Sequence, residues 1–165
     1  MNDQQLADAT WVLLMGSRNL ADRDVVWNVL DGLYRRYRPV MLVQGGAKGT
    51  DTHGRQWVHQ RHRQGWAVDQ REEPAKWAVC SSTSCTPRHR HRRADGSTYC
   101  PTAGHYRNLL MVDTVAVKAR AGRGVYVAFF VRGAGNRGTT HCAAAARAAG
   151  IPEAIREIWV DSAAE

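Results

Sequence analysis

The sequence predicts an α/β protein, a Rossmann-like three-layer sandwich with a mostly parallel sheet and a Cys/His-rich insert. Short apolar runs that resemble strands alternate with helix-like segments along most of the chain. These runs are apolar at consecutive positions, which is typical of strands covered on both faces. The 165 residues, 44% of them hydrophobic, suit a single domain over residues 1–165 with a full core. Alternating strands and helices favour parallel pairing with right-handed crossovers.

The first half of the chain supplies three strands and two helices in alternation. "TWVLLMG" (10–16) is a buried strand, and the helix that follows (22–38) has Asp22 at its start. The apolar residues of this helix recur at helical spacing: Val26, Val29, Leu30 and Leu33. "VMLVQ" (40–44) is a second buried strand, residues 51–64 form a helix, and "WAVDQ" (66–70) is a weaker strand.

The second half of the chain resumes the alternation after an interruption. Residues 78–104 contain Ser, Thr, Arg, His and Cys with almost no aliphatic side chains, so we expect an insert there. A helix over 105–119 leads to "VYVAFFV" (125–131), the clearest strand of the chain. An alanine-rich helix (139–150) ends with a glycine in the C′ position, and "REIWV" (156–160) is the last strand.

The net charge of +8 predicts an attraction for phosphate groups, in nucleotides or in nucleic acid. Arginines concentrate in "RRYR" (35–38) and "RHRHRR" (88–93), although each run can also be a solvated face. No apolar run approaches the roughly 20 residues that a membrane helix needs. The polar start "MNDQQLADAT" is unlike a secretory signal, so we expect a cytoplasmic protein whose four cysteines are thiols or metal ligands.

Glycine-rich segments follow three of the predicted strands: "GSR" (16–18), "GGAKGTD" (45–51) and "RGAGNRGTT" (132–140). The carboxyl ends of parallel strands meet at one edge of a sheet, where such folds bind ligands. Glycine lets backbone approach a ligand closely, and a helix N-terminus offers N–H groups to phosphate. Each segment alone can be a plain turn, and none is a Walker A loop or a G-x-G-x-x-G fingerprint.

The order of five motifs resembles the SLOG superfamily, specifically its YspA/YpsA-related branch of small Rossmann-like proteins, common in actinobacteria and their bacteriophages. The motifs are "GSR", "GGAKGTD", "AGHYRNLLMV" (103–112), "VAFF" and "GNRGTTHCAAAARAAGIP" (135–152). The resemblance covers residues 10–160. It implies a pocket for a nucleotide or nucleotide-derived ligand, such as an ADP-ribose-like signal. Many SLOG proteins pair, so the resemblance also allows a homo-oligomer.

Carried over to this sequence, the resemblance implies a specific set of ligand-binding residues. They are Gly16, Ser17, Arg18, Gly45, Gly46, Ala47, Gly49, Thr50, Asp51, Arg107, Asn108, Gly138, Thr139 and Thr140. Asp51 suits a ribose diol, or else caps the following helix. Arg18 and Arg107 suit phosphate through their forked donors, or else are surface arginines. Asn108 suits a ligand contact, or else orients a loop.

Catalysis is a separate question, because related cytokinin-activating phosphoribohydrolases carry a glutamate on the helix after a P-G-G-x-G-T motif. Here "TTHCAAAARAAG" has no acid, so the carboxylate candidates come from elsewhere in the chain: Asp51, the one we would assign a catalytic role, and Glu72 or Glu73. Binding as a sensor or sequestering protein is therefore the favoured function. A nucleotide phosphoribohydrolase and a nucleic-acid-binding protein acting through the basic insert are the alternatives.

The insert carries Cys80, Cys85, His89 and Cys100, a set that predicts a structural zinc site. His91 or His105 could replace His89 as the fourth ligand. A segment so poor in apolar side chains cannot hold itself together by burial, so a metal would have a structural role there. Free thiols in a loose loop, or a disulfide or redox pair, are the alternatives. The fourth cysteine, Cys142, lies among alanines and is expected to be a small buried hydrophobe.

Overall fold

The fold was analysed in a computed structural model, which describes residues 1–80, 85 and 87–162. Part of the predicted insert, residues 81–84 and 86, lies outside the described residues. At the centre is a five-stranded sheet in the order β3-β2-β1-β6-β7, in which every pairing is parallel. Its strands are β1 (Thr10–Gly16), β2 (Val40–Gln44), β3 (Val68–Glu72), β6 (Gly124–Val131) and β7 (Ile158–Val160).

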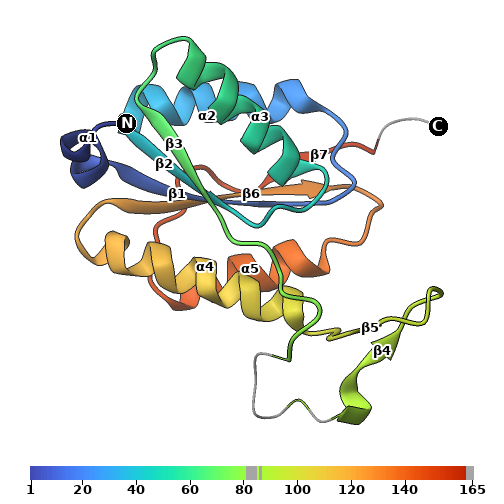
Figure 1. Cartoon of the computed structure of the whole chain (residues 1–165). Coiled ribbons are helices and arrows are strands. Elements are labelled where there is room, and N and C mark those ends of the chain that lie inside the picture. Colours follow the sequence, from blue (N-terminus) through green and yellow to red (C-terminus); the bar gives the residue numbers. More distant parts are fainter. Residues whose placement is uncertain (81–84, 86, 163–165) are drawn as a thin grey trace.

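Helices cover both faces of this sheet, as Figure 1 shows, so the predicted Rossmann-like sandwich is confirmed. The helices α2 (Arg23–Tyr37) and α3 (Thr50–Arg63) lie on one face, and α4 (Ala103–Arg120) and α5 (Arg137–Ala148) on the other. The helix α2 starts as expected, because the Asp22 carboxylate accepts hydrogen bonds from two N–H groups of its first turn.

Strand β1 is continuously apolar from Trp11 to Met15, and its packing explains why. Val12 and Leu14 belong to the core beneath α2 and α3. Leu13 and Met15 alternate with them and belong to the core beneath α4 and α5. Successive side chains of a strand point to opposite faces, so a strand between two helical layers needs apolar residues throughout.

Five local elements differ from expectation. Helix α5 starts at Arg137, two residues earlier than predicted, and β7 starts at Ile158, two residues later. Strand β3 begins at Val68, two residues later than predicted, because Trp66 stacks on Tyr34 before the strand pairing starts. The short helix α1 (Asp3–Asp8) was missed, since it buries no residue and depends on a capping box from Asn2. Helix α4 starts at Ala103, two residues earlier than expected.

The insert between β3 and α4 contains the 3₁₀ turn η1 (Pro87–His89) and a small antiparallel hairpin. The hairpin strands are β4 (His91–Arg92) and β5 (Thr98–Tyr99). In Figure 1 this insert extends from the sandwich below the start of α4. Sequence reasoning predicted an insert here, but its hairpin has too few residues to show a period-two pattern.

The strand order determines where a ligand can bind. The chain runs outward from β1 through β2 to β3, and then returns to place β6 on the other side of β1. The loops that leave β1 and β6 therefore diverge at the carboxyl edge of the sheet, which is where open α/β sheets bind ligands. Among the described residues, no helix is long and apolar enough to cross a membrane.

Candidate ligand pocket and cysteine cluster

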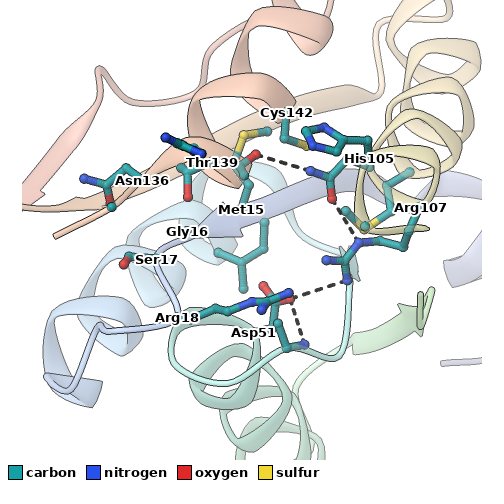
Figure 2. Close-up of a pocket in the computed structure, with 18 of the residues that line it drawn as sticks. Met15, Gly16, Ser17, Arg18, Asp51, His105, Arg107, Asn136, Thr139 and Cys142 are labelled. Atoms are coloured by element: carbon teal, nitrogen blue, oxygen red, sulfur yellow. Dashed lines mark hydrogen bonds and ion pairs between the residues drawn. The ribbon is translucent and has the colours of Figure 1, made fainter. Parts of the chain in front are cut away.

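A pocket of about 450 Å³ lies at this diverging edge, a size typical of small-molecule sites. Its walls come from the β1–α2 loop, the start of α3, the start of α4 and the start of α5. Figure 2 shows side chains from these elements converging on the same space. Segments far apart in sequence thus meet in one cavity, as the three glycine-rich segments predicted.

Most of the predicted ligand-binding residues line this pocket. The lining members are Gly16, Ser17, Arg18, Ala47, Asp51, Arg107, Asn108, Gly138 and Thr139. The remaining predicted residues lie outside its lining: Gly45, Gly46, Gly49, Thr50 and Thr140. The predicted loops therefore line one pocket, while the positions within the β2–α3 loop divide between the pocket and the packing behind it.

The glycines of the β2–α3 loop are explained by contacts inside the protein. Gly49 has φ +70°, and a Cβ there would meet the backbone carbonyls of Ser17 and Arg18. Thr50 is fully buried, and its hydroxyl donates to the Ser17 carbonyl at 3.2 Å. At Gly45, a Cβ would collide with the Arg107 guanidinium. At Gly45 and Gly49 the missing side chain makes room for Arg107 and for the β1–α2 loop. These two glycines serve packing within the protein instead of contact with a ligand.

The Asp51 carboxylate holds the β2–α3 loop in place through hydrogen bonds to its backbone. Its Oδ2 accepts hydrogen bonds from the Gly45 N–H at 3.2 Å and the Ala47 N–H at 3.1 Å. The predicted alternative of helix capping is not observed, since the N-cap position is Gly49. Burial raises the pKa of Asp51, against the opposing effect of these hydrogen bonds and of the Arg107 charge. One oxygen of this carboxylate is therefore already used to hold the backbone of its own loop.

A chain of side-chain contacts joins three walls of the pocket. Arg107 Nη1 donates to the Gly45 carbonyl, and its Nε donates to Asn108 Oδ1 at 2.9 Å. Asn108 Nδ2 in turn donates to the Gly138 carbonyl at 3.2 Å. Figure 2 shows Arg107 between Asp51 and the start of α5. Asn108 therefore orients a loop, which was one of the two roles predicted for it.

Positive charge without an acidic partner gathers at the pocket mouth. Arg18 and Arg137 are exposed, line the pocket and form no ion pair within the described part of the chain. The first turn of α5 has no side-chain cap, so its N–H groups remain available to an anion. A Cβ at Gly138, on this turn, would meet nothing within 4 Å. This side of the pocket can accept phosphate.

Several lining residues were missed by sequence reasoning, notably Trp77, Asn136 and Arg137. Asn136 and Arg137 lie within the quoted segment 132–140, so its polar residues were a usable signal. Trp77 lies just before the predicted insert and faces the pocket with the Arg18 guanidinium 6.0 Å from its ring centroid. No periodicity marks Trp77, because it belongs to an irregular segment.

Cys142 also lines the pocket but does not have the chemistry of a nucleophile. It is buried in the core beneath α4 and α5, as expected for a small hydrophobe. Burial raises the pKa of its thiol to about 12, so the thiolate is scarce near neutral pH. The neighbouring His141 ring packs edge-on against His105, with 4.5 Å between centroids.

Three of the predicted metal ligands lie together in the insert. The Sγ atoms of Cys80, Cys85 and Cys100 are all within 4.8 Å of one another, an arrangement compatible with a metal site. His89 adjoins them, with its Nε2 3.5 Å from Cys100 Sγ. Hydrogen bonding from Thr102 lowers the pKa of Cys100 to about 6, with burial opposing and His89 adding to the effect.

The two alternative histidines lie elsewhere. His91 packs edge-on against Tyr99 in the hairpin, with 5.7 Å between ring centroids. His105 lines the ligand pocket and faces His141. Among the histidines considered from the sequence, His89 is therefore the one that the fold brings to the cysteines.

Comparisons with known proteins agree with the resemblance noted in the sequence. Residues 10–78 match the YspA, cpYpsA-related SLOG family. The Gene 61 protein of Mycobacterium phage D29 is 34% identical over 142 residues, covering 86% of this chain and 91% of that protein. The X-ray structure of DNA processing protein A (DprA) from Streptococcus pneumoniae is 15% identical, with a TM-score of 0.48. That similarity covers 96% of this chain and 60% of DprA, so the chain spans about three fifths of its length. The family match over residues 10–78 and the phage relative together establish that this chain belongs to the YspA, cpYpsA-related SLOG family.

Proposed function

We propose that the pocket binds a nucleotide or nucleotide-derived ligand of the ADP-ribose type, and that the protein acts as its sensor or sequestering protein. One observation carries the proposal: Arg18 and Arg137, which form no ion pair with any residue that the structure describes, share a pocket with the uncapped first turn of α5. Forked guanidinium donors and free backbone N–H groups are the partners that phosphates prefer. Membership of the SLOG family, whose proteins are nucleotide-related, supports the same ligand class.

The pocket also offers a surface for the rest of such a ligand. Trp77 contributes a flat aromatic face, and Met15 of β1 and Met111 of α4 contribute apolar atoms. A purine ring could stack on Trp77 while its phosphates lie toward Gly138, with the ribose between them. Thr139, buried at the α5 start, supplies a hydroxyl donor near the phosphate position.

Binding without hydrolysis fits these side chains better than a phosphoribohydrolase. Asp51 is the one carboxylate on the wall of this pocket within the described residues. Its Oδ2 already accepts two backbone hydrogen bonds. Release of free base from nucleoside monophosphates would support the enzyme instead, and Asp51→Asn should abolish that release if Asp51 is the catalytic acid.

Isothermal titration with ADP-ribose, NAD and nucleoside monophosphates tests the proposal. At least one ligand is expected to bind, and Arg18→Ala and Arg137→Ala should each weaken it by about tenfold, the loss of one charge-assisted contact. Arg120→Ala, an exposed arginine at the far end of α4, is the matched control and should leave the affinity unchanged. Failure of the folded protein to bind any of these ligands would refute the proposal.

The insert, with its 3₁₀ turn and hairpin, supports a second candidate function, nucleic-acid binding. Arg88, Arg92 and Arg93 are exposed and form no ion pair within the described residues. Such a cluster suits a phosphate backbone, and binding should weaken steeply as salt rises. A shift assay with single-stranded DNA at two salt concentrations tests it. Arg92→Ala with Arg93→Ala should remove binding, whereas Arg120→Ala with Arg156→Ala should not.

The cysteine cluster supports a further proposal, that Cys80, Cys85 and Cys100 bind a structural zinc ion. Zinc is held in proteins by four Cys or His ligands, and the insert has little apolar surface with which to hold its own shape. Elemental analysis of protein purified without chelators should give about one zinc per chain. A chain that purifies with all four cysteines as free thiols and no metal would contradict it.

A further inference from the structure

The cysteine cluster stands directly behind one wall of the ligand pocket. Trp77 lines the pocket, and Cys80 follows it by three residues. The Cys100 N–H donates to the Trp77 carbonyl at 2.8 Å, and Pro101, the next residue, lines the pocket as well. Two of the cysteines are therefore attached through short stretches of backbone to residues that a ligand would touch.

Two distances in the cluster match those of a tetrahedral zinc site, and the Sγ atoms of the three cysteines lie within 4.8 Å of one another. His89 Nε2 also lies 3.1 Å from Thr102 Oγ1, a contact that it would exchange for the metal. Zinc–sulfur bonds of about 2.3 Å and zinc–nitrogen bonds of about 2.0–2.1 Å place two sulfurs about 3.8 Å apart, and a sulfur and a nitrogen about 3.6 Å apart. Cys85 Sγ and Cys100 Sγ are 3.9 Å apart, and Cys100 Sγ and His89 Nε2 are 3.5 Å apart. The three cysteines are free thiols that share one locus, an arrangement compatible with ligands of a single ion.

Neighbouring groups would support a charged site of this kind. Three thiolates and one neutral histidine around Zn²⁺ leave a net charge of −1. Arg90 Nη1 donates to Cys80 Sγ at 3.7 Å, and the same guanidinium holds the Thr98 carbonyl through Nη2 at 2.9 Å. Thr102 Oγ1 lies 3.3 Å from Cys100 Sγ. Such outer contacts orient metal ligands and balance their charge.

From this arrangement we infer that a zinc ion bound by Cys80, Cys85, His89 and Cys100 holds the Trp77–Pro101 wall in place, so that ligand affinity depends on the metal. The effect on affinity rests on the proposed function of the pocket, whereas the metal site itself does not. Without the metal, the wall keeps the Cys100–Trp77 hydrogen bond and the packing of Trp77 against Tyr99, while its flank at Ala78 and Val79 is exposed. Segments of that kind open readily, and a wall that must be ordered on binding lowers affinity.

The ligand set is tested by metal content and by cobalt substitution. Cys85→Ser and His89→Gln should lose zinc, whereas His91→Gln and His105→Gln, the matched histidine controls, should keep it. Cobalt(II) in the wild-type protein should give the visible bands of tetrahedral thiolate coordination. Retention of zinc by His89→Gln, or its loss from His91→Gln, would overturn the assignment of His89.

The link to the pocket is tested by removing zinc from the wild-type protein with a chelator. Hydrogen exchange of residues 75–80 and 98–104 should rise, the Kd for ADP-ribose should increase by about tenfold, and added zinc should reverse both. Release of zinc with unchanged exchange in these residues would overturn the inference. Unchanged exchange elsewhere in the sheet serves as the control for global unfolding.

The outcomes also separate this inference from the proposed function. If zinc-loaded protein binds none of the nucleotides, the ligand assignment fails, while the exchange experiment still decides whether zinc orders the wall. If ADP-ribose binds equally well to the zinc-loaded and zinc-free proteins, the coupling is wrong and the proposed function stands.

Discussion

Gly49 and Gly138 show how one residue type serves two purposes at the same edge of the sheet. Gly49 has a positive φ and presses against the carbonyls of Ser17 and Arg18, so its missing side chain joins two loops. Gly138 has open space where a Cβ would be, on the uncapped start of α5. In the sequence, both glycines look like parts of glycine-rich turns. Their roles differ because backbone atoms lie next to Gly49, whereas open space lies next to Gly138.

Alanine at these two glycines should give opposite results. Gly49→Ala should lower the free energy of unfolding by about 1–3 kcal/mol, because the backbone conformation is strained for alanine and backbone atoms occupy the Cβ space. Gly138→Ala should leave stability unchanged or raise it by up to about 1 kcal/mol, since alanine favours helix. Chemical denaturation measures both, and equal destabilisation by the two substitutions would contradict this assignment.

The helices α2 and α3 are tied together by Asp31, which forms the polar link of that layer. Its carboxylate accepts hydrogen bonds from Arg61 Nη2 at 2.6 Å, Arg61 Nε at 2.8 Å and Trp57 Nε1 at 2.7 Å. Burial alone would raise the pKa of Asp31, but the hydrogen bonds from Arg61 and Trp57 and the Arg61 charge outweigh it and lower the pKa. The Asp31 and Arg61 side chains are both more than four fifths buried, so this ion pair contributes more to stability than a surface ion pair does.

Asp31→Asn should cost about 1–3 kcal/mol of stability at pH 7, the range for losing a charged hydrogen-bond partner. A carboxylate whose pKa is lowered on folding stabilises the native state above its unfolded pKa of about 3.9. That contribution is lost as pH falls through the lower folded pKa. The difference between wild type and variant should therefore be largest near neutral pH and shrink below about pH 4.

Denaturation series at several pH values check this dependence. Asp161→Asn is the matched control, because its ion pair with Arg132 has side chains that are 90% and 65% exposed. It should change stability by less than about 0.5 kcal/mol at every pH. A constant Asp31→Asn effect from pH 7 to pH 3 would show that packing, rather than charge, accounts for the loss.

At the scale of the whole molecule, the net charge of +8 and the position of the pocket act together. The pocket joins both helical layers, because its walls include the start of α3 from one layer and of α4 and α5 from the other. A bound anion would therefore stabilise the sandwich as a unit and offset part of its charge repulsion.

ADP-ribose at about 100 times its Kd should raise the free energy of unfolding by about 2.7 kcal/mol. Thermal melts with ADP-ribose, compared with sodium chloride at matched ionic strength, separate specific binding from screening. The Arg18→Ala variant should show a smaller shift at the same ligand concentration. An equal shift from sodium chloride alone would indicate charge screening without a bound ligand.

Local sequence patterns account for most of the fold. Continuous apolar runs identified β1, β2 and β6, because a strand between two helical layers buries every side chain. The glycine-rich loops after these strands identified the pocket edge, because parallel strands end together. Helix α1 and the insert hairpin escaped prediction, since both are short and depend on capping and turn contacts rather than on periodicity.

The candidate site was only partly predictable, for a physical reason. Residue types marked the loops, and the short spacing of the cysteines marked their cluster. Whether Gly45 faces a ligand or the Arg107 guanidinium depends on α4, whose Arg107 is 62 residues away in sequence. The roles of Asp51 and Trp77 likewise depend on the folded chain. The Asp51 carboxylate binds its own loop, and Trp77 becomes part of the pocket wall.

By itself, then, the sequence determined the sandwich, the edge of the sheet that carries the pocket, and the cysteines able to share a metal. Those properties follow from local periodicity, residue chemistry and the parallel order of the strands. Only the tertiary structure decided which side chains face the pocket and which pack behind it, and which histidine meets the cysteines. These depend on contacts between distant segments, whose directions no local pattern specifies.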